Sequence, residues 1–219
     1  MELAKYIEHT LLKPDVISSE IDQLCQDAIN YQFRAVCVPP IFVKRAATLL
    51  ENNPTKVVSI VGFPMGYSAI AAKVEEVKRA IDEGVQEIDT VINLAAVKDG
   101  QWSHVYNDID SVTRATHLKG KVLKVIVEAG LLTPSELSKV CDICVGMGVD
   151  YVKTSTGFHG TGATVSMVQN LRGMLPKRTK IKASGGIKTT EFAQELINAG
   201  ANSIGTSSAL KIIGVASTT

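Results

Sequence analysis

The sequence lacks an excess of charge of either sign, and it lacks long apolar runs. Its 23 lysines and arginines face 22 aspartates and glutamates, so the surface offers no net field for nucleic acid or for an anionic membrane. No apolar run approaches the roughly 18 residues of a membrane span, and the opening MELAKYIEHT lacks the basic start and apolar centre of a signal peptide. We therefore expect a cytoplasmic protein that acts on a small molecule, with no nucleic acid and no membrane as partner.

Patterns that bind metals are also scarce. Cys141 and Cys144 form a C-x-x-C pair inside a predicted helix, but no second pair completes a tetrahedral zinc site. We expect both to be buried thiols. The histidines show no metal-ligand spacing; they are His9, His104, His117 and His159. The sequence therefore predicts no metal and no cofactor.

What the chain does contain is an alternation of short apolar runs and amphipathic segments. With 219 residues, 45% of them hydrophobic, its composition is that of a globular protein, and we expect one domain over residues 1–219. Strands are expected at 6–11, 35–38, 56–61, 87–92, 121–127, 150–155, 180–184 and 202–207. Helices are expected between them, for example at 18–31, 70–83, 134–147 and 189–199.

Short strands that are apolar on both faces, with a helix after each, predict a parallel sheet covered by helices. A doubly wound open sheet usually has about five or six strands. Eight strand–helix units in a chain of this length fit a (β/α)₈ barrel better. We therefore predict the α/β class and a TIM barrel.

An internal repeat supports the barrel. The stretches EGVQEID, MGVDYVK and AGANSIG each end a helix on a glycine (Gly84, Gly148 and Gly200) and begin a strand within three residues, as expected of a glycine in a left-handed helix cap. The register of the repeat places Asp89 and Lys153 at the same height in the barrel.

Charged residues lie inside four neighbouring strands, which are expected to be buried on both sides. They are Asp89, Lys124, Lys153 and Lys182. A lone strand lysine often reaches solvent, and a lone Asp–Lys contact can be purely structural. Four on consecutive strands, in a fold whose active site lies at the carboxyl ends of the strands, point to one catalytic site. Lys180, which begins its strand, is expected to be a solvated lysine.

Three lysines beside one carboxylate cannot all stay charged in a pocket of low dielectric, because burial and like charges both favour the neutral amine. A free lysine, with a pKa of about 10.4, is neutral in less than about one molecule in a thousand at pH 7. A lysine whose pKa is much lower becomes a nucleophile that forms a Schiff base with carbonyl compounds. The charged strands therefore predict covalent carbonyl chemistry.

Glycine and hydroxyl side chains follow the last two predicted strands, in SGGIKTTE at 184–191 and GTSSALK at 205–211. Loops at these places in a barrel commonly hold a phosphate, helped by a helix N-terminus. A further run, TSTGFHGTGAT at 154–164, follows the strand of Lys153. The predicted phosphate-binding residues are Gly185, Gly186, Lys188, Gly205, Ser207 and Ser208.

Seven motifs spread over nearly the whole chain resemble those of the deoxyribose-phosphate aldolase family. They are HTLLKP at 9–14, AVCVPP at 35–40, VGFPMG at 61–66, EIDTVIN at 87–93, LKVIVEAG at 123–130, VKTSTGF at 152–158 and KASGGIKT at 182–189. The resemblance implies a class I aldolase on a (β/α)₈ barrel. Its members cleave 2-deoxy-D-ribose 5-phosphate reversibly to acetaldehyde and D-glyceraldehyde 3-phosphate, without a metal, in deoxynucleoside catabolism.

Carried over by position, the resemblance makes Lys153 the Schiff-base lysine, Lys182 the neighbour that lowers its pKa, and Asp89 an acid and base working through water. Lys124 would assist that proton transfer. Cys37 matches a cysteine near the pocket, where it either packs or touches the substrate. The resemblance adds Gly157 to the residues that would hold the phosphate, and it makes Thr156 a residue that lines the pocket. We further expect a homo-oligomer, either a dimer or a tetramer.

Four positions depart from the family pattern. Glu8 stands where many members have aspartate, FHGTGAT replaces a more glycine-rich run, and Ala209 stands where glycine is frequent. The tail GVASTT lacks the tyrosine that some members use in proton transfer, so Asp89, Lys124 and water must suffice.

Two other functions fit the same residues. One is a phosphate-binding isomerase on the same fold, which would use a carboxylate base and no covalent step. The other is a non-catalytic phosphosugar-binding protein, in which the lysines serve only as counterions.

Overall fold

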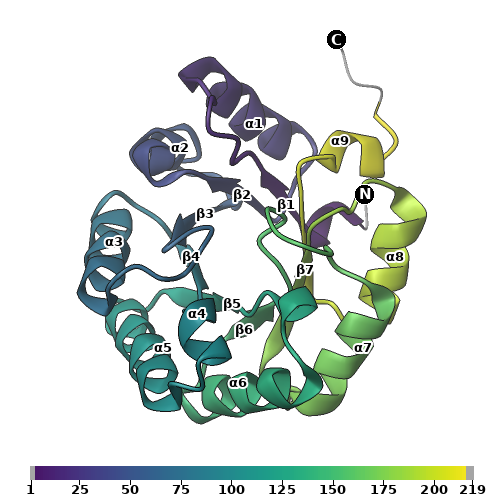
Figure 1. Cartoon of the computed structure of the whole chain (residues 1–219). Helices are drawn as coiled ribbons and strands as arrows, with labels where there is room; N and C mark the ends of the chain where they lie inside the picture. The colour runs from purple at the N-terminus through teal and green to yellow at the C-terminus, as the bar shows by residue number, and fades with distance from the viewer. Residues whose placement is uncertain (1–2, 216–219) are drawn as a thin grey trace.

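The computed structural model describes residues 3–215, and these form a closed barrel of parallel strands in the order β1 to β8 (Figure 1). The predicted (β/α)₈ fold is confirmed, and the strand ends differ from the predicted ones by no more than two residues. The strands are β1 (Ile7–Thr10), β2 (Ala35–Val38), β3 (Lys56–Val61), β4 (Glu87–Val91), β5 (Val122–Ile126), β6 (Tyr151–Lys153), β7 (Lys180–Ser184) and β8 (Ser203–Thr206).

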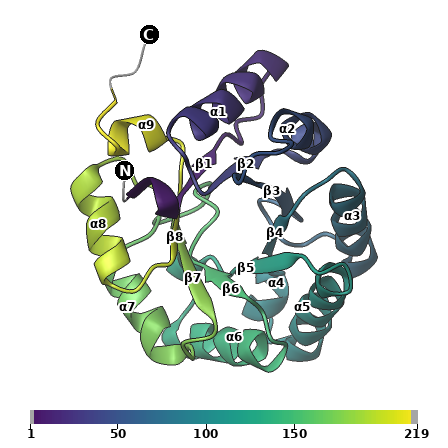
Figure 2. The same cartoon turned by 180° about the vertical axis from the view of Figure 1, so that it is seen from behind.

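Helices surround the strands on all sides, as both views show (Figures 1 and 2). They are α1 (Ser18–Asn30), α2 (Val43–Leu49), α3 (Ile70–Asp82), α4 (Leu94–Lys98), α5 (Trp102–His117), α6 (Pro134–Gly146), α7 (Val165–Met174), α8 (Thr190–Asn198) and α9 (Ala209–Ile212). Short 3₁₀ segments lie at Leu3–Tyr6, Pro40–Phe42 and Ala129–Leu131. None of the helices in residues 3–215 has the length and apolar character needed to cross a membrane.

The main hydrophobic core lies between the strands and the helices. Val36 and Val38 of β2 point outward into it, while Ala35 and Cys37 of the same strand belong to a second, smaller cluster inside the barrel. Each large aliphatic side chain buried in the outer layer contributes about 1.5–3 kcal/mol. Because that layer supplies most of the apolar burial, the inner face of the barrel is free to carry polar groups.

Two local predictions are confirmed. Gly84, Gly148 and Gly200 follow α3, α6 and α8 with φ angles of 106°, 72° and 116°, the left-handed region in which glycine replaces other residues at little cost. Cys141 and Cys144 are free buried thiols in α6. Burial raises the pKa of Cys141 to about 12, so this thiol is unreactive near neutral pH.

A buried ion pair holds the carboxyl end of β4 to the helices. Lys73 of α3 is fully buried, and its Nζ lies 2.7 Å from Oδ2 of Asp108 in α5 and 2.8 Å from the carbonyl oxygen of Val91. Burial lowers the pKa of Lys73 and raises that of Asp108, in each case against the attraction of the partner. The pair therefore fixes the strand that carries Asp89.

Replacing Lys73 by methionine is expected to lower the free energy of unfolding by about 3–5 kcal/mol, because it leaves the Asp108 carboxylate buried without its partner. Chemical denaturation measures the change. The control is Lys78→Met on the same helix, where the Lys78 side chain is 58% exposed and the expected change is within about 0.5 kcal/mol. Equal effects of the two substitutions would contradict the importance of the buried pair.

Candidate active site

A cavity of about 370 Å³ opens at the carboxyl ends of the strands, where loops from β1, β6, β7 and β8 meet. Lys153 lies in its lining and is only 3% exposed. The lining residues are Thr10, Leu11, Leu12, Lys13, Lys153, Thr156, Gly157, Phe158, Ser184, Gly185, Gly186, Ile187, Lys188, Gly205, Thr206 and Ser207. The buried amine therefore faces a space large enough for a small phosphorylated sugar.

Asp89 gathers three lysines at the base of this cavity. Its Oδ2 lies 2.8 Å from Nζ of Lys153 and 2.7 Å from Nζ of Lys182. Its Oδ1 lies 2.9 Å from Nζ of Lys124. The four charged strand residues of the sequence thus meet at one point.

Strand register explains how they meet. Asp89 on β4 is level with Lys124 on β5, and Lys153 on β6 is level with Lys182 on β7. Lys124 is level with Tyr151, two residues before Lys153, so Lys124 and Asp89 both lie deeper in the barrel than Lys153. The expectation that Asp89 and Lys153 lie at the same height is therefore wrong. Inward-facing positions alternate along each strand, and Asp89 therefore receives lysines from two different layers.

The expectation of a single carboxylate beside three lysines is wrong. Glu8 on β1 forms an ion pair with Lys182, and its carboxylate lies 2.7 Å from Arg34 and 3.5 Å from Lys124. Glu87 on β4 binds Arg34 and Lys124, each at 2.7 Å. The interior therefore holds the cations Arg34, Lys124, Lys153 and Lys182 against the carboxylates Glu8, Glu87 and Asp89.

These extra carboxylates change the expected pKa values. Burial alone would lower the pKa of Lys182, but Asp89 and Glu8 outweigh it and the pKa is raised. The pKa of Lys124 is raised for the same reason. Burial alone would raise the pKa of Asp89, yet the surrounding lysines hold it well below its usual range. Crowding of cations therefore does not by itself make Lys124 or Lys182 give up a proton.

The loops predicted to bind phosphate lie at the cavity. Gly157, Gly185, Gly186, Lys188 and Ser207 all line the cavity. Gly186 has a φ of 75° and open space where a side chain would project, so an anion can approach its backbone closely.

Gly205 also lines the cavity, but its lack of a side chain serves Lys182 as well. A Cβ at this position would lie 2.9 Å from Cε of Lys182. Ser208 does not line the cavity; it is half-buried at the start of α9, and its N–H donates to Oγ1 of Thr206 at 2.9 Å. Lys180, at the other end of β7, is exposed as predicted.

Cys37 is packed rather than open to the cavity. It is fully buried inside the barrel with Ala35, Val58 and Ile60, and burial raises the pKa of its thiol. Of the two expected roles, the structure therefore supports packing.

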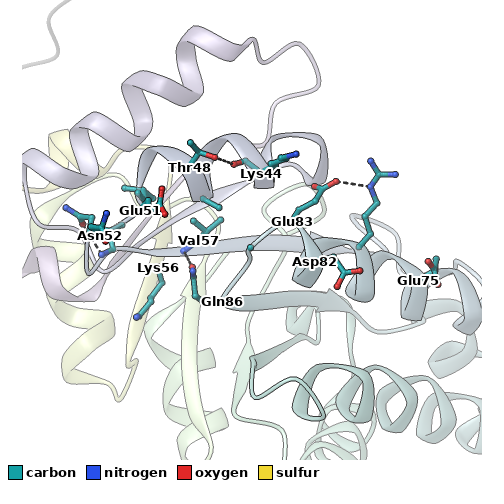
Figure 3. A pocket seen from close by; sticks show the side chains of 16 residues that line it. Lys44, Thr48, Glu51, Asn52, Lys56, Val57, Glu75, Asp82, Glu83 and Gln86 are labelled. Atoms are coloured by element: carbon teal, nitrogen blue, oxygen red, sulfur yellow. Dashed lines mark hydrogen bonds and ion pairs between the residues drawn. The ribbon is translucent and has the colours of Figure 1, made fainter.

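A larger groove of about 890 Å³ lies at the opposite end of the barrel, between α2 and α3 (Figure 3). Its lining includes Lys56, which begins β3, and Gln86, which precedes β4. Charged side chains of both signs surround it, and Arg79 is paired there with Glu83 at 3.0 Å. This groove is remote from the carboxyl ends of the strands, and its lining holds three basic and four acidic residues. It lacks the cationic character that a phosphate would need, so it is not the candidate site.

Sequence reasoning missed Glu8, Glu87, Arg34 and Lys13 as residues of the site. Glu87 was recognisable, because it lies two residues before Asp89 and must share its inward face. Glu8 was noted only as a departure from a motif. The sequence carries no local signal for Arg34, because its partners Glu8 and Glu87 lie on other elements, β1 and β4.

Within residues 3–215, no group of histidine, cysteine and carboxylate side chains is arranged to hold a metal ion.

Glu8→Gln is expected to lower the free energy of unfolding at pH 7 by about 3–5 kcal/mol, because buried cations lose a carboxylate partner. Burial alone would raise the pKa of Glu8, but Lys124, Lys182 and Arg34 outweigh it and lower the pKa to about 2. The stabilisation by the ionised carboxylate is therefore complete above pH 4.5, the ordinary pKa of a glutamate. That stabilisation is lost as the pH falls to about 2. The variant should lose less stability over that range in pH-dependent denaturation.

Glu75→Gln serves as the control, because this side chain is 75% exposed and should change stability by no more than about 0.5 kcal/mol. An acid-induced loss of stability as large in Glu8→Gln as in the parent would show that the Glu8 carboxylate does not have the expected role.

The chain is similar to known aldolases along nearly its whole length. The model of the family described as DeoC/LacD family aldolase matches residues 3–217. A "Deoxyribose-phosphate aldolase" of Metamycoplasma hominis is 46% identical over 201 residues, covering 92% of each chain. One of Thermococcus gammatolerans is 45% identical over 215 residues, covering 97% of this chain and 96% of the relative.

A solved structure agrees with these sequence relatives. The structure described as the "unique tetrameric structure of deoxyribose phosphate aldolase" from Aeropyrum pernix superposes with a TM-score of 0.91 and 33% identity. The match covers 97% of this chain and 89% of that one. The full-length family match, the sequence identity and the shared barrel together show that the chain belongs to the DeoC/LacD aldolase family.

Proposed function

We propose that the protein is a class I aldolase that reversibly cleaves 2-deoxy-D-ribose 5-phosphate to acetaldehyde and D-glyceraldehyde 3-phosphate. The observation that carries the proposal is the position of Lys153, a buried amine in the wall of a cavity whose other wall is made of glycine-rich loops. The named activity of the similar proteins from Metamycoplasma hominis and Thermococcus gammatolerans supports it.

Lys153 is the amine of the cluster best suited to be a nucleophile. Its Nζ has one carboxylate partner, Asp89, whereas Lys182 contacts two carboxylates and Lys124 contacts three. With every group ionised, the four cations exceed the three carboxylates by one charge. Release of one proton from Lys153 makes the buried cluster neutral, and the lone pair then faces the cavity.

The proposed reaction begins when the Lys153 amine attacks the aldehyde carbon of the open-chain sugar. Loss of water from the resulting carbinolamine gives an iminium. Removal of the proton of the C3 hydroxyl then breaks the C2–C3 bond, and the electron pair flows into the iminium to form an enamine. Glyceraldehyde 3-phosphate leaves first. Protonation of the enamine carbon and hydrolysis release acetaldehyde and restore Lys153.

Neighbouring groups supply the proton transfers and the charge balance. Lys182, whose pKa is raised, keeps a proton and stands against the same Asp89 oxygen as Lys153, so it is placed to protonate the departing hydroxyl of the carbinolamine. Asp89 holds the two amines side by side and can pass a proton through a water. Lys124, bound to the other Asp89 oxygen, keeps that carboxylate ionised.

The glycine-rich loops would hold the phosphate. Gly186 offers close backbone approach, whereas the missing side chain of Gly185 leaves room for the backbone of Gly162. Gly185 and the exposed Lys188 and Ser207 lie in the same lining. Binding energy from this remote group fixes the sugar so that its aldehyde carbon meets the Lys153 amine.

Incubation with acetaldehyde and borohydride is expected to place one ethyl group on Lys153, located by peptide mass spectrometry. The reduction traps the iminium that forms only on the nucleophilic lysine. Lys153→Met should remove the label and lower kcat/KM for the sugar phosphate at least about 10⁴-fold, because the covalent step is lost.

The matched control is Lys180→Met, on the exposed end of β7, which should keep both the label and the turnover. No label in the parent protein would favour an isomerase or a binding protein. A label only on Lys182 or Lys124 would overturn the role of Lys153 and keep the reaction class.

We also propose that the protein is a cytoplasmic homo-oligomer, a dimer or a tetramer. The description of the Aeropyrum pernix structure as tetrameric supports the oligomer, and a charged sugar phosphate that does not cross membranes supports the location. Light scattering coupled to gel filtration should give a mass that is a multiple of the 23.4 kDa chain; a mass of one chain at micromolar concentration would contradict the oligomer.

A further inference from the structure

Glu128 has an unusual backbone and a buried carboxylate that the reaction described above does not use. It follows β5 by two residues, is fully buried, and has φ 48° and ψ 54°. This left-handed conformation is strained for a residue other than glycine. One carboxylate oxygen, Oε1, has no hydrogen-bond partner among residues 3–215. Such a strained and incompletely paired residue points to a role in function.

The other carboxylate oxygen binds Thr156 in two ways. Oε2 of Glu128 accepts the backbone N–H of Thr156 at 3.0 Å and its hydroxyl at 2.6 Å. Close by, the N–H of Ala129 donates to the carbonyl oxygen of Thr154 at 2.9 Å. The end of β5 is therefore joined to the loop that follows Lys153.

These bonds decide what the Thr156 hydroxyl can do in the cavity. A hydroxyl has one proton and two lone pairs, and here the proton is directed to the carboxylate. One lone pair accepts the N–H of Phe158 at 3.1 Å. The other remains, so Thr156 can only accept a hydrogen bond from a further group. Thr156 lines the same cavity as Lys153, Gly185 and Gly186.

We propose that Glu128 is a positioning residue that fixes the Thr156 hydroxyl as an acceptor for a hydroxyl of the substrate. The proposal rests on the proposed function. In an extended sugar phosphate bound between Lys153 and the glycine loops, the C3 hydroxyl is needed for bond cleavage, and the C4 hydroxyl is the free donor next to the phosphate. Because cleavage turns C3 into the aldehyde carbon, this C4 hydroxyl is the hydroxyl beside the carbonyl of glyceraldehyde 3-phosphate. Glu128 thus acts through Thr156 to select aldehydes that carry a hydroxyl at that position.

A purely structural role for Glu128 predicts a different result. If it only anchors the loop, its loss should disturb all substrates alike. If Glu128 directs the proton of the Thr156 hydroxyl so that this hydroxyl can only accept, its loss should affect only substrates that carry a hydroxyl beside the carbonyl. The two substrates for the test are glyceraldehyde 3-phosphate and 3-phosphooxypropanal, which lacks that hydroxyl, each condensed with acetaldehyde.

The first variant is Glu128→Gly, which removes the carboxylate and suits the left-handed backbone. The second is Thr156→Val, which keeps the shape of the side chain and the backbone N–H but has no hydroxyl. Each should lower kcat/KM for glyceraldehyde 3-phosphate roughly 3- to 10-fold, the effect of one lost hydrogen bond. Each should leave kcat/KM for 3-phosphooxypropanal close to that of the parent.

The double variant should behave like Thr156→Val alone, because the two residues act as one unit. Equal losses with both aldehydes, or additive losses in the double variant, would overturn the proposal and leave Glu128 as a loop anchor. Absence of condensation by the parent protein would instead overturn the proposed function, and with it this role of Glu128. The two failures are therefore distinguishable.

Discussion

The interior of this barrel depends on the contacts that Asp89 makes with three lysines. Taking a charge out of water costs several kcal/mol unless an opposite charge and hydrogen bonds replace the water. Closing the barrel places β1 beside β8 and brings Glu8 to the lysines of β5 and β7. Every charged group of the cluster thereby gains an opposite partner, and the lysine with the fewest such partners, Lys153, faces the cavity.

The two layers of the barrel divide stability from chemistry. Packing between strands and helices provides the apolar core, while the inner faces of β2 and β3 carry only a small apolar cluster that includes Cys37. The charges lie on the inner faces of β1, β4, β5, β6 and β7. The buried Lys73–Asp108 pair fixes the end of β4, so the outer layer also determines where Asp89 stands.

The sequence predicted most of the fold and the centre of the site, because both follow from local patterns. Apolar runs of strand length marked seven of the eight units, and the strand at 6–11 was expected from its place in the repeat. Glycine caps marked three of the units, and lysines inside buried strands identified Lys124, Lys153 and Lys182. The missing parts depend on contacts across the barrel. Arg34, the residue before β2, reaches Glu8 on β1 and Glu87 on β4. The second role of Gly205 depends on the path of the Lys182 side chain. Glu128 reaches Thr156, in the loop after β6, from a residue with a left-handed backbone.

The central claim is that the buried carboxylates keep Lys124 and Lys182 charged around an ionised Asp89. A neutron structure of the protein at pH 7 would locate the protons on these three groups directly. We predict ammonium groups on Lys124 and Lys182 and no proton on Asp89. A neutral Lys182, or a proton on Asp89, would contradict the claim.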